Sequence, residues 1–163
     1  MNTQILVTQA GLADLQSELS GLQTKRPQVV ERLSVARSMG DLSENSDYIS
    51  AREELEFLDG RIGELEDMIH SAKVVAPSSN DKIDFGHTVT VKIDSTQTTF
   101  QIVGEPEADP KQRKISHQSP LGLALMGKKI GDKVEVDAPV GKLTYSILEI
   151  KSLLISKKAE TSS

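Results

Sequence analysis

Two carboxylate residues three positions apart, Asp41 and Glu44, are the side chains of this sequence best suited to chemistry. Two interpretations of the pair are open. In the first, Asp41-Leu42-Ser43-Glu44 is a capping box that opens a helix, with Asp41 as its N-cap. In the second, both carboxylates share a hard cation such as Mg²⁺, which proteins often bind with only one or two carboxylates. Such a pair is an incomplete metal site, and a partner must supply the remaining ligands.

The negative charge of the chain is concentrated around this pair. The 163 residues have a formal net charge of −5. Residues 38–60 alone carry seven carboxylates and one basic side chain, Arg52, whereas residues 77–163 carry 12 basic and 11 acidic side chains. A protein this acidic is not expected to bind free DNA or RNA through phosphate neutralisation alone.

Composition excludes several other kinds of site. The chain has no cysteine, so we expect no disulfide, thiolate metal site or catalytic thiol. Its three histidines are too dispersed to predict a zinc site, and two Tyr and three Phe leave little for an aromatic pocket. No apolar run approaches the roughly 18 residues of a membrane-spanning helix, and the N-terminus lacks a signal-peptide pattern. We therefore expect a cytoplasmic protein without membrane contact.

The acidic pair must be positioned by two helices. Apolar residues recur at alternating steps of three and four, at seven of eight positions over 12–36 and, counting Tyr48, at all eight over 48–72. This pattern is typical of coiled-coil helices that each bury one stripe. The gap between them, at 40–45, is too short for anything but a tight reversal, so the helices must be antiparallel.

The length of this hairpin places its tip, residues 40–47, far from any hydrophobic core. We expect the first helix to begin at Thr8 or Gln9 and to stop near Gly40. Its residues 12–39 alone would span about 42 Å at 1.5 Å per residue. Pro27 lies inside it and should bend the helix or remove a hydrogen bond. An apolar residue at such a tip, Leu42, has no core to join and suggests that something receives it.

From residue 77 onward the pattern changes to that of a small β domain. Ser119 and Pro120, followed by Gly127, predict one short helix with a serine N-cap. Alternating apolar residues predict four strands, near 89–93, 100–102, 133–137 and 142–150.

The sequence thus predicts an α+β protein with two parts. Residues 1–76 form the antiparallel coiled-coil hairpin, and 77–82 form a linker. Residues 83–155 form a small antiparallel sheet with one helix, and 156–163 form a polar tail.

Two groups of residues resemble the Gre transcript-cleavage factors of bacteria, and the resemblance runs from about Thr8 to Ile150. The acidic hairpin is similar to the GreA type rather than to the more basic GreB type. The chain departs from the expected pattern by continuing past Ile150. The matching residues of the hairpin are Gly40-Asp41-Leu42-Ser43-Glu44-Asn45, Tyr48, Ala51-Arg52-Glu53 and Arg61-Ile62. Those of the C-terminal half are Ile115-Ser116, Ser119-Pro120-Leu121-Gly122, Ala124-Leu125, Gly127-Lys128, Gly131-Asp132, Val134 and Pro139-Val140-Gly141.

The resemblance implies an FKBP-like C-terminal domain that docks on bacterial RNA polymerase, and we assign the docking to Ser119, Pro120 and Leu121. It also implies that the hairpin enters the secondary channel of the polymerase. There Asp41 and Glu44 would help to hold the second Mg²⁺ and position the water that cuts backtracked RNA. The polymerase itself would coordinate the other, tightly bound metal ion. We therefore expect a monomeric accessory factor that is not itself an enzyme and that binds Mg²⁺ weakly when free.

Other residues of the hairpin end would support this chemistry. Leu42, Ser43 and Asn45 are expected to support the tip, the last two by orienting water or fixing the turn. Arg37 and Arg52 would face the 3′ end of the nascent RNA. Alternatively, Arg52 pairs with Glu56 four residues further on.

Two other functions remain open. One is an inhibitory regulator that occupies the same channel without stimulating cleavage, although retention of both Asp41 and Glu44 argues for cleavage. The other is a prolyl isomerase or chaperone, suggested by the FKBP-like fold. Fold does not carry function, and the scarcity of aromatic residues leaves little material for a proline pocket.

Overall fold

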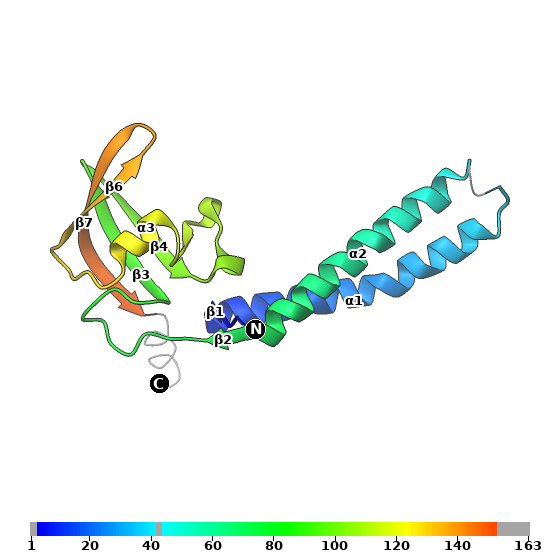
Figure 1. Cartoon of the computed structure of the whole chain (residues 1–163), viewed down its shortest axis with the longest axis horizontal. Helices are drawn as coiled ribbons and strands as arrows, with labels where there is room; N and C mark the ends of the chain where they lie inside the picture. The colour runs from blue at the N-terminus through cyan, green and yellow to red at the C-terminus, as the bar shows by residue number, and fades with distance from the viewer. Residues whose placement is uncertain (1–2, 42–43, 153–163) are drawn as a thin grey trace, which may run out of the picture. The chain divides into compact units, whose positions relative to one another are not determined.

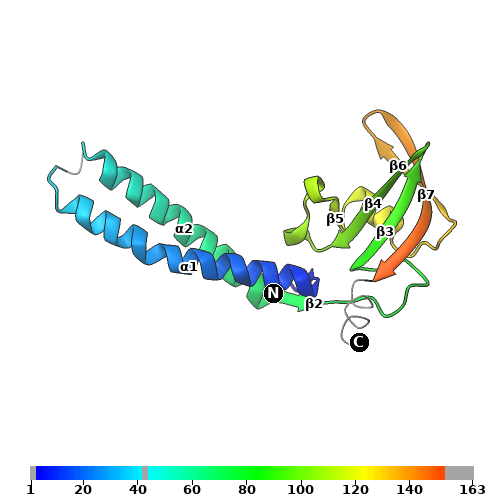
Figure 2. The same ribbon diagram turned by 180° about the vertical axis from the view of Figure 1, so that it is seen from behind.

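The computed structural model describes residues 3–41 and 44–152, which fall into two compact units (Figures 1 and 2). Residues 12–72 form the first, which we call the hairpin unit. Residues 3–11 and 73–152 form the second, the β unit. The sequence assigned all of residues 1–76 to the hairpin, and the difference arises from two short strands that flank it. These are β1 (Ile5–Val7) and β2 (Ala72–Val74), which pair with one another in a two-stranded sheet.

The hairpin unit consists of two long helices that lie side by side and antiparallel, as predicted (Figure 1). Helix α1 spans Gln9–Arg37, with Pro27 inside it, and helix α2 spans Ser46–Ser71. Every apolar residue of the two predicted stripes is buried or half-buried. The most deeply buried are Leu15, Val29 and Ala36 on α1 and Ala51, Leu58 and Leu65 on α2.

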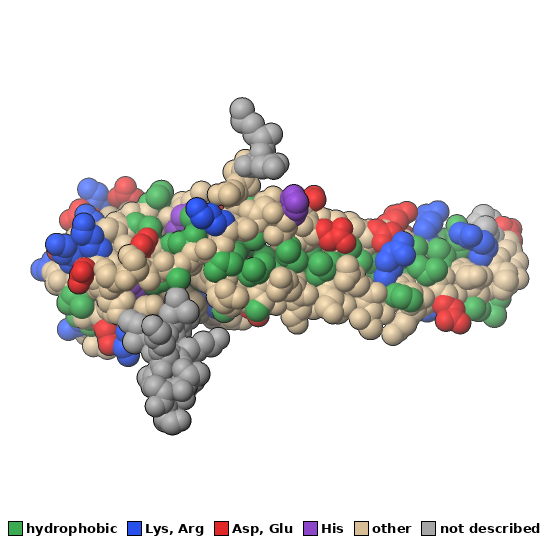
Figure 3. Space-filling view, turned by 90° about the horizontal axis from the view of Figure 1, so that it is seen from below, with side chains coloured by type: hydrophobic (Ala, Val, Ile, Leu, Met, Phe, Trp, Pro, Cys, Tyr) green, Lys and Arg blue, Asp and Glu red, His purple; other side chains and the backbone are tan. Residues whose placement is uncertain are grey.

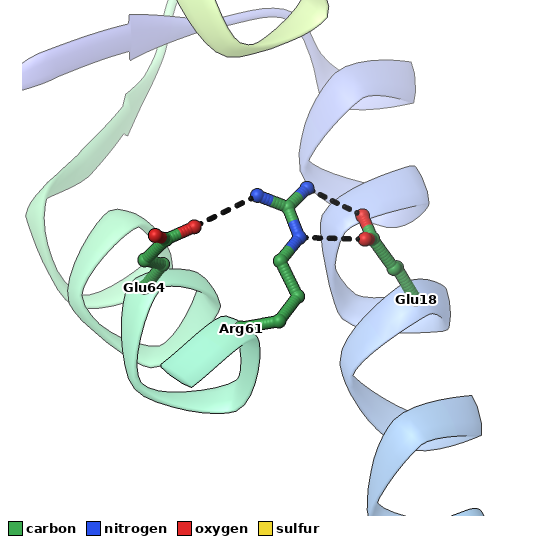
Figure 4. A network of polar contacts seen from close by, with 3 residues as sticks. All are labelled: Glu18, Arg61 and Glu64. Atoms are coloured by element: carbon green, nitrogen blue, oxygen red, sulfur yellow. Dashed lines mark hydrogen bonds and ion pairs between the residues drawn. The ribbon is translucent and has the colours of Figure 1, made fainter. Parts of the chain in front are cut away.

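Ion pairs on the surface join particular positions of one helix to particular positions of the other. The Arg61 guanidinium donates to both carboxylate oxygens of Glu18 on α1, at 2.8 and 3.0 Å, and also contacts Glu64 on its own helix (Figure 4). Arg26, the only polar residue of the predicted α1 stripe, pairs with Asp59 of α2. On the face shown in Figure 3, a row of apolar side chains follows the hairpin and is flanked by charged ones. The paired charges thus help the apolar stripes to set one register.

The β unit contains a five-stranded sheet with the order β5-β4-β3-β7-β6. Its core packs Val89, Val91 and Ile102 against Leu125 and Ile147. The strands are β3 (His87–Ile93), β4 (Thr96–Val103), β5 (Lys114–Ser116), β6 (Lys133–Ala138) and β7 (Gly141–Ser152), and the helix α3 is Pro120–Leu125. The four predicted strands and the short helix are all present.

The sheet is antiparallel as predicted except at one edge, where β5 runs parallel to β4. The chain between them is too long for a tight hairpin turn and contains two 3₁₀ turns, η1 (Glu105–Glu107) and η2 (Pro110–Gln112). Parallel strands need such a longer connection. The sheet is therefore mixed, and the three-residue β5 was too short to show an alternating pattern.

The predicted tail at 156–163 lies outside the described residues. Among the helices that the structure describes, none is both long enough and apolar enough to cross a membrane.

Candidate functional site

The two carboxylates singled out in the sequence lie between α1 and α2, at the end of the hairpin. Both Asp41 and Glu44 are exposed. Gly40, just before them, has a φ of 120°, in the left-handed region that favours glycine, so the chain turns there as expected. Leu42 and Ser43, predicted to support the tip, lie outside the described residues.

The N-cap of α2 is Asn45, so the interpretation of Asp41 and Glu44 as a capping box is wrong. The Asn45 side-chain oxygen accepts a hydrogen bond of 3.1 Å from the Tyr48 N–H, and the helix begins only at Ser46. Asparagine is as good an N-cap as aspartate, and here it satisfies the free N–H of the first turn. Both carboxylates therefore precede the N-cap residue and the helix itself.

Asn45 also connects the two helices. Its side-chain amide donates a hydrogen bond of 2.7 Å to the carbonyl oxygen of Ala36 in the last turn of α1. The last carbonyls of a helix have no partner within that helix. The Ala36 carbonyl accepts instead from Asn45 and from the Met39 N–H just beyond the helix, the latter at 3.1 Å. A single half-buried side chain thus fixes the end of α1 against the beginning of α2, directly beside the acidic turn.

The two arginines predicted to face RNA meet at one aromatic ring. The guanidinium carbons of Arg37 and Arg52 each lie 5.9 Å from the centre of the Tyr48 ring, within the range of a cation–π contact. Within residues 3–41 and 44–152, Arg52 forms no ion pair with Glu56, contrary to the alternative considered above. Tyr48 was part of the sequence signature, but sequence reasoning gave it no role at the site.

The donor atoms at the tip fit magnesium only as part of a larger ligand set. Carboxylate oxygens are ligands that Mg²⁺ prefers, and one or two of them often suffice when waters or phosphates complete the octahedron. In the described part of the chain, no group of three His, Asp or Glu side chains is placed to hold a metal ion. Asp41 and Glu44 could thus contribute to a shared site.

The residues predicted to dock on a partner surround the start of α3. The Ser119 hydroxyl accepts from the Gly122 N–H at 3.0 Å and donates to the Ser116 carbonyl at 2.6 Å, so it caps the helix. Pro120 is exposed, whereas Leu121 packs partly against the core. Sequence reasoning did not single out Leu123, which is 64% exposed on the same helix. An exposed leucine on a helix of only six residues has no signal in the sequence that separates it from the buried ones.

Comparison with known proteins identifies the family. Residues 5–74 match the family model described as "Transcription elongation factor, N-terminal", and residues 78–152 match "Transcription elongation factor, GreA/GreB, C-term". Together the two models cover nearly the whole chain. The chain belongs to the GreA/GreB family of transcription elongation factors.

Individual relatives of the GreA type are similar over most of their length. The transcription elongation factor GreA of Lactococcus lactis subsp. cremoris (strain MG1363) is 46% identical over 149 residues, which cover 88% of this chain and 96% of the relative. That of Rhodospirillum rubrum is 47% identical over 153 residues, 91% of this chain and 98% of the relative. The crystal structure of GreA factor homolog 1 (Gfh1) of Thermus thermophilus is 26% identical, covers 92% of this chain and 100% of that chain, and superimposes with a TM-score of 0.44.

Proposed function

We propose that this chain binds bacterial RNA polymerase, inserts its hairpin into the secondary channel and stimulates Mg²⁺-dependent cleavage of backtracked nascent RNA. Arrested complexes would then resume elongation from a new 3′ end. One observation carries this proposal: Asn45 caps α2, so the exposed carboxylates Asp41 and Glu44 are not needed for the helix cap. The GreA names of the relatives support the same function.

Each residue of the tip has a separate part in this proposal. Asp41 and Glu44 offer oxygen ligands to the metal and accept a hydrogen bond from the attacking water. Magnesium, when bound, supplies stabilisation of the negative charge that develops on the phosphate. Asn45 holds the turn between the two helix ends, and Leu42 and Ser43 support the tip. Arg37 and Arg52 bind phosphate groups of the RNA.

The protein would act as an accessory factor rather than as an enzyme. Two carboxylates are an incomplete site, so the polymerase must supply the other metal ligands and hold the RNA. The free protein would bind Mg²⁺ only weakly and leave isolated RNA intact. Docking would rest on the β unit, at Ser119, Pro120 and Leu121, where Pro120 is exposed.

The test uses stalled, backtracked elongation complexes with labelled RNA and Mg²⁺. Wild type should release 3′ fragments, and Asp41→Ala and Glu44→Ala should each reduce the rate by about 100-fold or more, a loss typical of removing a group that stabilises the transition state. Glu56→Gln, which removes an exposed charge elsewhere on α2, is the matched control and should cleave normally.

Each outcome of this experiment has a separate meaning. If wild type releases no fragments, the cleavage function is wrong, and a slowed polymerase would then favour the inhibitory alternative. If both alanine variants cleave at the wild-type rate, the assignment of the tip is wrong. Loss of cleavage with unchanged polymerase binding would support chemistry at the tip and affinity in the β unit.

A further inference from the structure

The ring of Tyr48 contacts basic side chains from both helices of the hairpin. Arg37 is the last residue of α1, and Arg52 lies one turn beyond Tyr48 on α2. Each guanidinium carbon is 5.9 Å from the ring centre. The Tyr48 N–H donates a hydrogen bond to the Asn45 side chain, which in turn donates one to the Ala36 carbonyl of α1. The half-buried ring is therefore fixed relative to both helices, and it can fix the two guanidinium groups relative to one another.

These two arginines differ from the other basic residues along the hairpin. Four other basic side chains all pair with carboxylates of the opposite helix: Lys25 and Arg32 with Glu54, Arg26 with Asp59, and Arg61 with Glu18. Within residues 3–41 and 44–152, no ion pair includes Arg37 or Arg52. An aromatic ring attracts a cation through its quadrupole but does not neutralise it. Two positive charges are thus held near one ring and remain available to an anion.

A phosphodiester is the anion that this arrangement fits best. The planar guanidinium fork binds phosphate oxygens in pairs, and two forks at one ring can share one phosphate group. Arg37 precedes Asp41 by only four residues in the sequence. A phosphate bound by Arg37 would therefore lie near the carboxylates that we propose to act on RNA. An acidic surface of the polymerase is the alternative anionic partner. We favour the phosphodiester, because binding to such a surface would give the nearby carboxylates Asp41 and Glu44 no role.

We propose that Tyr48 is a positioning residue that holds Arg37 and Arg52 together on its ring, so that the pair receives a phosphodiester group of the backtracked RNA. This proposal rests on the proposed function and deepens it. Arg37 and Arg52 contact the RNA, and Tyr48 acts only through them. Without the ring, two like charges would separate, and each arginine would bind the phosphate less often.

The experiment compares Tyr48→Leu with Tyr48→Phe in backtracked elongation complexes. Leucine keeps an apolar side chain at this position of the stripe but removes the ring, whereas phenylalanine keeps the ring. At saturating factor, Tyr48→Leu should lower the cleavage rate roughly fivefold, because each arginine–ring contact is weak at an exposed site. Tyr48→Phe should cleave like wild type. Phe57→Leu is the matched control, since Phe57 is 71% exposed on the same helix and should tolerate loss of its ring.

A second arm tests whether Tyr48 acts through the arginines. In an Arg37→Gln/Arg52→Gln background, the change Tyr48→Leu should have no further effect, because residues that act as one unit are not additive. If the fivefold loss persists in that background, the ring acts on the fold instead, and the proposal is wrong. A raised half-maximal factor concentration with an unchanged maximal rate would assign the arginines to the polymerase surface and also overturn it. Failure of the proposed function appears in the wild type, whereas failure of this proposal appears only in the variants.

Discussion

The hairpin unit and the β unit are stabilised in different ways. The hairpin buries one apolar stripe per helix, and its cross-helix ion pairs lie on exposed surface, as with Arg26 and Asp59. The β unit encloses a core and also buries polar groups such as His87 and Thr8. Throughout the described residues, no buried side-chain polar atom lacks a hydrogen-bond partner. Few neighbours constrain the surface of the hairpin, whereas most substitutions inside the β unit disturb several contacts at once.

The two units can be followed separately in solution. The chain has two tyrosines and no tryptophan, with Tyr145 in the core of the β unit and Tyr48 in the hairpin. In a Tyr48→Phe background, tyrosine fluorescence reports the β unit alone. Circular dichroism at 222 nm reports mainly the hairpin, because α1 and α2 have 29 and 26 residues and α3 has six.

The largest effect is expected for Gly104→Ala in the β unit. A Cβ atom at Gly104 would lie 1.9 Å from the carbonyl oxygen of Leu6, which belongs to the backbone and cannot rotate away as a flexible side chain could. Strand β1 must then separate from η1. We expect the free energy of unfolding of the β unit to fall by about 3 kcal/mol, at the upper end for single substitutions. Urea unfolding followed by Tyr145 fluorescence measures this, and an unchanged midpoint would contradict the close approach of the two segments.

Glu107→Ala should have the next largest effect, because this carboxylate serves three donors. It accepts from the Thr8 N–H at 2.9 Å, from the Thr8 hydroxyl and from the Gly104 N–H at 3.1 Å. We expect a loss of about 2 kcal/mol, typical of hydrogen bonds to a charged group. Glu105→Ala, an exposed neighbour in the same turn, is the control.

The hairpin offers a contrasting carboxylate in Glu64, whose side chain is 66% exposed where it meets Arg61. Glu64→Ala should leave the 222 nm transition almost unchanged, since exposed ion pairs contribute little. If Glu107→Ala lowered the free energy of unfolding as little as Glu64→Ala, charged side chains would contribute equally in the two units. The difference that we describe between the units would then be wrong for charged groups.

These carboxylates also show what the sequence could not reveal. The helical stripes were predictable, because their period can be followed within one stretch of sequence, as from Leu58 to Leu65. The cap of α2 was not, because Asp41 and Asn45 are equally good N-caps, and the choice involves a bond from Asn45 to Ala36 on the other helix. Likewise, nothing in the sequence singled out Glu107, since its partner Thr8 is 99 residues away in the chain. Local patterns predicted the elements, and contacts distant in sequence decided their ends.

Lowering the pH should weaken the β unit before the hairpin. Burial is the main cause that lowers the pKa of His87, whose Nδ1 accepts from the Asp84 N–H at 2.8 Å and whose Nε2 contacts the Asn80 side-chain oxygen at 3.0 Å. The folded state therefore favours neutral His87, and its contribution to stability is complete above the unfolded pKa of about 6.5. As the pH falls below that value, the unfolded chain binds the proton first, and stability decreases by at most about 1.4 kcal/mol per pH unit.

The hairpin should respond only at lower pH. Hydrogen bonds from Lys25 and then Arg32 lower the pKa of Glu54, so its contribution is present above the unfolded pKa of about 4.3 and is lost below it. Between pH 7.5 and 5.5, Tyr145 fluorescence should show a lower urea midpoint, while the 222 nm signal of the hairpin should not. His87→Gln should flatten the pH dependence of the β unit. A midpoint that falls equally in that variant would assign the effect to another group.

A small effect of opposite sign is expected for Gly60→Ala on α2. A Cβ atom there would meet nothing within 4 Å, and the residue lies inside a helix, where alanine is favoured over glycine by about 0.8–1 kcal/mol. The 222 nm melting temperature should therefore rise, with cleavage of backtracked RNA unchanged. The same glycine-to-alanine change thus stabilises one unit and disrupts the other at Gly104, because only the β unit fills the space around its backbone. A destabilised Gly60→Ala variant would mean that this face of α2 is covered by a contact that the isolated chain does not contain, such as a second copy, which a concentration series would reveal.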